Sequence, residues 1–200
     1  KAEVRAHLPV WLDTWYKPKA LNALANFGYL NPGAVFPEVV DSEDRPLFQA
    51  EGAGHPLLPD AERIYNDFEI AGPGEIAIVT GSNMSGKSTF LRTLGVTLCL
   101  GYAGGPVIAS RVRTGPFRIF TCIQVSDSVT DGISYFYAEV KRLKALLEAL
   151  EAADRRPLFF LIDEIFRGTN NRERLIGSRA YLKALATGNG VGAVATHDLE

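Results

Sequence analysis

The chain has few of the features that mark disulfide-rich or membrane proteins. Only two of its 200 residues are cysteine, Cys99 and Cys122, and they follow no C-x-x-C spacing. We therefore expect both thiols to be small core residues, in a reducing cytoplasm. No window reaches the roughly 18 uninterrupted apolar residues of a membrane span, and the N-terminus lacks a signal pattern. These absences predict a soluble piece of protein without membrane contact.

The chain also lacks a charge excess, internal repeats and low-complexity tracts. It has 21 Lys and Arg against 23 Asp and Glu, so no overall electrostatic footprint for nucleic acid is present. This leaves DNA binding by another part of a longer protein open. With 46% hydrophobic residues, the chain can bury a substantial core as one domain. Because it starts at Lys1 and stops just after an apolar run, we expect a piece of a longer protein.

Apolar runs alternate with helical patterns after residue 70, which indicates an α/β layered fold with a mostly parallel sheet. We expect a short amphipathic helix near residues 18–27, and mainly loops with at most short strands over 31–60. The expected strands are 75–80, 117–124, 158–162 and 191–196, and the expected helices are 87–100, 134–151 and 172–186.

Residues 81–88 fill the pattern G-x-x-x-x-G-K-[ST] without a mismatch, through Gly81, Gly86, Lys87 and Ser88. In this pattern the glycines let backbone N–H groups turn toward phosphates, the lysine supplies a positive charge, and the hydroxyl can ligate Mg²⁺. An apolar run precedes the loop and a helical pattern follows it, as a nucleoside triphosphate site requires. The alternative is a glycine-rich surface turn with a stray lysine, which this context disfavours.

Asp163 and Glu164 follow directly after the apolar run 158–162. At the end of a strand, Asp163 can reach Mg²⁺ opposite Ser88. Glu164 then points elsewhere and can polarise the water that attacks the γ-phosphate. The alternative is a strand end with two solvated acids.

Two further polar residues stand at the ends of predicted elements. His197 follows the last apolar run and is suited to sensing the γ-phosphate or fixing the attacking water, although a lone histidine more often has a structural role. Ser134 precedes a predicted helix, where it can cap the helix or present a second phosphate-contacting surface.

Together, four segments resemble the C-terminal ATPase domain of the MutS family of DNA mismatch-repair proteins. They are Gly81 to Thr89, Ser126 to Glu139, Asp163 to Asn170 and Ala195 to Asp198. The resemblance extends over most of residues 50–200. It implies an α/β P-loop NTPase with an ABC-ATPase-like layered fold, in which a mostly parallel central sheet is flanked by helices. The domain would span residues 51–200, truncated at its C-terminal end, and residues 1–50 would be the end of a preceding core or lever region and a linker.

The resemblance also implies a homodimer in which each ATP lies between two subunits. Ser134 would act in trans, Asn83 would contact the γ-phosphate, His197 would be the switch histidine, and Gly168 to Asn170 would lie at the interface. The adenine would lie near residues 64–66, with Tyr65 stacking on it. The other residues expected to bind the nucleotide are Gly81, Ser82, Met84, Ser85, Gly86, Lys87, Ser88 and Thr89. Ser88 and Asp163 would bind the metal ion. Glu164, His197 and Lys87 would be the catalytic residues.

This chain departs from the usual family pattern at several positions. Mismatch-repair members usually carry proline and glycine where this chain has Ser82 and Ser85, and a Ser-Thr pair near Asn170 and Asn171. These departures indicate a divergent branch. The mismatch-reading domain is not part of these residues, so the DNA substrate stays open.

The leading hypothesis is a MutS-like ATPase domain that passes its nucleotide state to DNA-binding regions elsewhere. One alternative is a module that binds ATP as a switch with little hydrolysis. Another is an ABC-type ATPase of a membrane transporter, which the lack of a Leu-Ser-Gly-Gly-Gln-type run disfavours.

Overall fold

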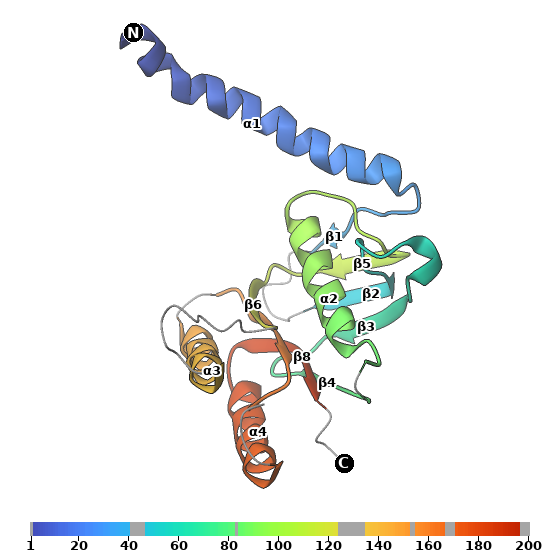
Figure 1. Cartoon of the computed structure of the whole chain (residues 1–200), viewed down its shortest axis with the longest axis vertical. Helices are drawn as coiled ribbons and strands as arrows, with labels where there is room; N and C mark the ends of the chain where they lie inside the picture. The colour runs from blue at the N-terminus through green and yellow to red at the C-terminus, as the bar shows by residue number, and fades with distance from the viewer. Residues whose placement is uncertain are drawn as a thin grey trace.

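The structure is a computed structural model that describes residues 2–40, 47–82, 84–123, 135–152, 155–166 and 171–196. Figure 1 shows a layered α/β body from which one long helix extends. In chain order the elements are α1 (Ala2–Leu30), β1 (Glu38–Val39), β2 (Phe48–Ala53), the 3₁₀ helix η1 (Asp60–Glu62), β3 (Asn66–Ile70), β4 (Ile76–Thr80), α2 (Lys87–Tyr102), β5 (Arg111–Thr114), β6 (Arg118–Cys122), α3 (Tyr135–Glu151), β7 (Leu158–Asp163), α4 (Asn171–Ala186) and β8 (Gly190–Thr196).

A four-stranded parallel sheet has the strand order β4-β8-β7-β6. Its strands and the helices α2, α3 and α4 agree with the expected ranges to within about two residues, the usual uncertainty of element ends. The prediction of an α/β layered fold with a parallel sheet is therefore confirmed. Because all four strands run the same way, the chain segments that leave β4, β7 and β8 emerge at one edge of the sheet.

A second sheet, with the order β1-β5-β2-β3, was not predicted. It is mostly antiparallel, since β2 pairs antiparallel with both β3 and β5. Over residues 31–60 the prediction allowed at most short strands, and β2 is one of these: its six residues bury Phe48, Ala50 and Ala53. Nearby glycine and proline made this segment resemble a loop, and pairing with β5, about 60 residues later, overrides that local signal.

The parallel sheet is covered on both faces. On one face, α2 and the second sheet share a hydrophobic core with alternate residues of β7 and β8. On the other face, α3 and α4 pack on the remaining residues of these strands. Phe159 of β7 contacts the rings of Phe48, Phe68 and Phe117, with centroids 5.3 to 6.4 Å away, and so joins the two sheets.

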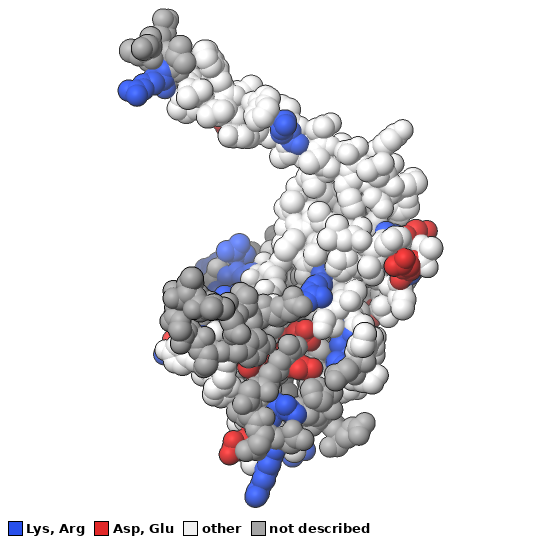
Figure 2. Space-filling view, viewed as in Figure 1, with Lys and Arg blue, Asp and Glu red and all other residues white. Residues whose placement is uncertain are grey.

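Helix α1 is much longer than the helix expected near 18–27, and that prediction is wrong in both extent and character. Its 29 residues include Pro9 and Pro18. A proline removes one helical hydrogen bond but has a helix-compatible φ, so helix-forming neighbours such as alanine and leucine continue the helix. The helix has large apolar side chains exposed along its length, and in Figure 2 its surface is mostly uncharged.

The two cysteines differ in their surroundings. Cys122 is buried, as expected, whereas Cys99 is exposed on α2, so the expectation of a core position is wrong for Cys99. Apolar residues near Cys99 in the sequence lie on the face of α2 that packs on the core, and Cys99 lies on another face. The apolar neighbours alone did not show on which face Cys99 lies. Among the described helices, none is long and apolar enough to cross a membrane.

Candidate functional site

The loop between β4 and α2, residues 81–86, depends on glycine at both ends. Gly81 has φ of 151° and Gly86 has φ of 93°, conformations that side chains disfavour. A Cβ atom at Gly81 would also come within 2.9 Å of Ser85 Oγ. Gly86 precedes α2, and no described side chain caps the helix. The N–H groups of the first turn are therefore open toward the loop, which favours an anion there.

Lys87 holds its ammonium group inside this loop. Its Nζ donates hydrogen bonds to the carbonyl oxygens of Gly81, at 2.7 Å, and Ser82, at 2.8 Å. The residue is buried, and the first turn of α2 has no acidic residue. None of the ion pairs among the described residues includes Lys87, and two backbone carbonyl oxygens hold its ammonium group.

The structure brings Ser88 and Asp163 together although they are 75 positions apart. Ser88 Oγ donates a hydrogen bond of 2.6 Å to Asp163 Oδ2. Asp163 is the last residue of β7 and is buried. A cavity of about 350 Å³ opens beside this pair, and its lining residues are Met84, Ser85, Gly86, Lys87, Ser88, Thr89, Asp163 and Glu164.

Glu164 lines the same cavity from an unusual backbone conformation. Its φ is 65°, in the left-handed region that residues with a side chain rarely adopt. Its N–H donates a hydrogen bond of 2.9 Å to the carbonyl oxygen of Ala195, in β8. The strand therefore ends sharply at Glu164 and does not continue past the cavity.

Several predicted site residues lie outside the described part of the chain. These are Asn83 in the loop, Ser134 before α3, the segment 168–170, and His197 after β8. Their predicted roles are not tested.

A second cavity, of about 510 Å³, lies along the other side of the loop. Residues of β4, the loop and α2 line it, together with His55, Leu58, Glu62 and Ile64 from the chain that precedes β3. His55 Nδ1 accepts a hydrogen bond of 3.3 Å from the N–H of Leu57, which requires that Nδ1 carry no proton. Burial, with the nearby positive charges of Arg92 and Arg63, lowers the pKa of His55 and so favours the same neutral form.

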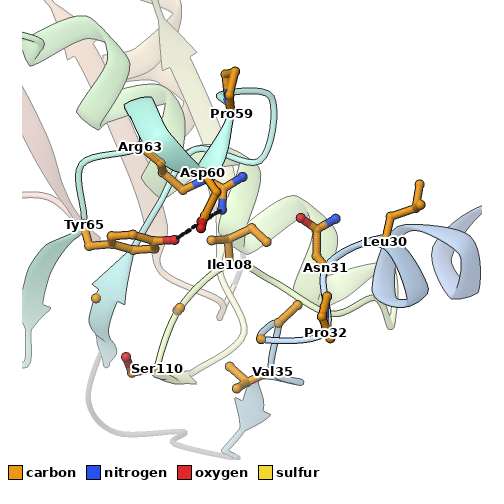
Figure 3. Close-up of a pocket in the computed structure, with 14 residues that line it drawn as sticks. Leu30, Asn31, Pro32, Val35, Pro59, Asp60, Arg63, Tyr65, Ile108 and Ser110 are labelled. Carbon is orange, nitrogen blue, oxygen red and sulfur yellow. Dashed lines mark hydrogen bonds and ion pairs between the residues drawn. The ribbon is translucent and has the colours of Figure 1, made fainter.

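Tyr65, expected to stack on adenine, lines a different cavity, of about 950 Å³, which borders the turn after α1. Its hydroxyl donates a hydrogen bond of 2.7 Å to Asp60 Oδ1, and Arg63 Nη1 bonds to the same carboxylate oxygen at 3.0 Å (Figure 3). Ile64 and Asn66, on either side of Tyr65, line the cavity beside the loop.

Within the segment 64–66, stacking on the adenine was assigned to Tyr65 and not to Ile64, and Leu58 and His55 were not predicted to line this cavity. The alternation of side chains along the segment that enters β3 gives the missing signal: if Asn66 faces the loop, Ile64 does too and Tyr65 does not. The stacking role of Tyr65 stays a prediction.

Comparison with known proteins finds one family over most of the chain. The profile of the family described as MutS domain V matches residues 77–200. The chain is 32% identical over 185 residues to "Endonuclease MutS2" of Thermus thermophilus, which covers 90% of this chain and 24% of that protein. It is 32% identical over 186 residues to "DNA mismatch repair protein MutS 2" of Halobacterium salinarum, with 90% and 21% covered.

A third relative, "DNA mismatch repair protein MutS" of Natronomonas pharaonis, is 37% identical over 126 residues, which cover 62% of this chain and 14% of that protein. The chain thus spans less than a quarter of the length of these relatives. Since the domain V match covers more than half of the chain, the protein belongs to the MutS family.

Proposed function

We propose that this chain binds ATP with Mg²⁺ at the loop 81–88 and hydrolyses it. The observation that carries the proposal is the hydrogen bond of 2.6 Å between Ser88 and Asp163, next to the buried ammonium of Lys87. A hydroxyl and a carboxylate are hard oxygen ligands of the kind Mg²⁺ prefers, and they leave further positions for phosphate and water. Lys87 and the open N–H groups of α2 offer positive potential to the phosphates.

The residues of the chain would act mainly through position and charge. Lys87 and the loop amides hold the phosphates, and Ser88 with Asp163 holds the metal ion. When bound, Mg²⁺ neutralises charge on the phosphate oxygens. Glu164 accepts a proton from the attacking water, a role that its position on the cavity wall supports.

The nucleotide base would lie in the cavity of about 510 Å³ on the other side of the loop. Leu58 and Ile64 offer apolar contact for a flat ring, and His55 offers a neutral imidazole. Ile64 supports this placement better than Tyr65 does, because Ile64 and the loop line one cavity.

We further propose that the site is completed in a homodimer, where Ser134 of one chain reaches the nucleotide of the other. Asn83, His197 and residues 168–170 would contact the γ-phosphate, the attacking water and the dimer interface. The names of the relatives, which refer to mismatch repair and an endonuclease, support a link to DNA through regions outside this chain. In this account the dimer closes on ATP and reopens after hydrolysis.

Titration of ATP with and without Mg²⁺, combined with hydrolysis assays, tests the proposal. Asp163→Asn should abolish the gain in ATP affinity that Mg²⁺ gives. Glu164→Gln should keep ATP affinity and lose about 100-fold or more in turnover, the usual cost of removing a general base. The matched control is Glu148→Gln, an exposed carboxylate on α3, which should behave as wild type.

Equal turnover in Glu164→Gln and the wild type would contradict the role of Glu164. Tight, Mg²⁺-dependent binding without any turnover would favour a nucleotide switch with little hydrolysis. Failure to bind ATP at all would overturn the proposal as a whole.

A further inference from the structure

The chain directly after Glu164 is held in a second unfavourable conformation. Phe166 has φ of 59°, so two residues with side chains adopt the left-handed region within three positions. A residue with a side chain keeps such a conformation only where contacts with the surrounding structure offset the strain of the backbone. Glycine would adopt this φ without strain, so the aromatic ring of Phe166 must make contacts that outweigh its backbone cost.

Those contacts lie on α4. A Cβ atom added at Gly177 would come within 3.0 Å of Phe166 Cε2 and 3.1 Å of Cδ2, so the ring lies directly against the helix backbone. The ring also meets Tyr181 edge to face, with centroids 6.2 Å apart and planes at 75°. Between Glu164 and Phe166, Ile165 is buried in the core formed with α3 and α4. Both Ile165 and Phe166 therefore anchor this segment, Ile165 in the core and Phe166 against α4.

Tyr181 extends these contacts to a third element. Its hydroxyl donates a hydrogen bond of 2.7 Å to the carbonyl oxygen of Leu143, in the middle of α3. Burial strongly raises the pKa of this hydroxyl, so it stays protonated as a donor throughout the physiological range. Helix α3 begins one residue after Ser134. The same contacts thus link the Glu164 loop to the helix that follows Ser134.

We propose that Phe166, fastened by Gly177 and Tyr181, is a positioning residue that holds Glu164 in its left-handed conformation and keeps its carboxylate at the cavity of Ser88 and Asp163. This inference rests on the proposed function, in which Glu164 accepts a proton from the attacking water. Phe166 itself is not among the residues that line this cavity. Its effect on hydrolysis is therefore indirect, through the backbone of two intervening peptide bonds.

The test compares Phe166→Gly, Phe166→Tyr, Gly177→Ala and the double variant Phe166→Gly/Gly177→Ala in the whole chain. Three quantities are measured: the dissociation constant of Mg²⁺-ATP, the single-turnover hydrolysis rate, and amide hydrogen exchange at Glu164, whose N–H bonds to Ala195. Phe166→Gly relieves backbone strain and removes the ring, whereas Gly177→Ala pushes a methyl group against it. Phe117→Ala, in the core between the two sheets, is the control for a general loss of stability.

Phe166→Gly and Gly177→Ala should each lower the hydrolysis rate about tenfold or more, because small misplacements of a catalytic group are costly. The ATP dissociation constant should stay within about twofold, and Glu164 amide exchange should speed up. Phe166→Tyr should keep the wild-type rate. The double variant should match Phe166→Gly, since Gly177→Ala acts only through the ring. Phe117→Ala should lower stability and keep both the rate and the Glu164 exchange of the folded protein.

A wild-type hydrolysis rate and unchanged Glu164 exchange in Phe166→Gly would overturn the positioning role. If Phe166→Gly does not fold, Gly177→Ala gives the same decision. A wild-type chain that binds ATP but never hydrolyses it would contradict the proposed function instead, and amide exchange would still decide whether Phe166 holds Glu164.

Discussion

Lys87, Ser88 and Asp163 bring charged and polar groups together at the candidate site through short hydrogen bonds. The ammonium of Lys87 bonds to two backbone carbonyl oxygens, and the hydroxyl of Ser88 bonds to the carboxylate of Asp163. Neither set of hydrogen bonds belongs to the hydrophobic core, because the cavity beside the loop is partly open to solvent. Burying polar groups also lowers the stability of the fold. The proposed ligand, ATP with Mg²⁺, would give each of these side chains a binding role.

The lowered pKa of His55 predicts how the free energy of unfolding depends on pH. Its pKa in the folded protein lies below 6.5, its ordinary value, chiefly because of burial. Below pH 6.5 the unfolded chain therefore binds a proton that the folded chain resists, and the free energy of unfolding should fall as pH falls. His55→Asn keeps an acceptor near the N–H of Leu57 and does not titrate, so it should flatten this part of the profile.

Urea unfolding of both proteins between about pH 5 and pH 7.5, a window that brackets the ordinary histidine pKa, measures this difference. Identical slopes for His55→Asn and the wild type would contradict a lowered histidine pKa.

At the scale of elements, strand β7 connects the packing between the two sheets with the candidate site. Phe159, fully buried, packs against aromatic rings of the second sheet, and the same strand ends in Asp163. Phe159→Ala should lower the free energy of unfolding by about 3–5 kcal/mol, the usual cost of a large cavity in a core. Phe36→Ala removes a ring that is 72% exposed and should cost less than about 0.5 kcal/mol. Urea unfolding compares the two variants, and equal losses would contradict the packing between the sheets.

The elements differ in how far the sequence alone could predict them. The parallel strands and helices α2, α3 and α4 were predictable because periodicity and glycine-rich boundaries act locally, and the pairing of Ser88 with Asp163 followed from parallel strand ends. Strand β2 was not, because its strand state depends on partners distant in the sequence. Which of Ile64 and Tyr65 lines the cavity beside the loop was also hard to predict, because neighbouring side chains in an extended segment point to opposite sides.

The solvent exposure of helix α1 can be tested by tryptophan fluorescence. The chain has two tryptophans, Trp11 and Trp15, both on α1 and 56% and 55% exposed. Tryptophan emission of the dilute chain should match that of water-exposed indole and be readily quenched by acrylamide. Urea that unfolds the β7 core should change this emission little. Blue-shifted emission protected from acrylamide would contradict an exposed α1.

At the scale of the whole molecule, the chain matches one part of longer relatives. It spans less than a quarter of their length and carries MutS domain V. The described residues bring the loop, Asp163 and Glu164 to one edge of the parallel sheet. In the proposed dimer, Ser134 from a second chain would complete the site, the nucleotide would join the two subunits, and hydrolysis would separate them.

The most direct test of this account is ATP turnover per chain, over a wide range of protein concentration, for Glu164→Ala, Ser134→Ala and their equimolar mixture. Half of the dimers in the mixture combine the two variants, and one of the two sites in each has both residues intact. Each variant alone should be inactive, turnover of the wild type should rise with concentration, and the mixture should regain about a quarter of the wild-type turnover. A mixture as inactive as its components, or a Ser134→Ala chain that turns over like the wild type, would contradict a composite ATP site.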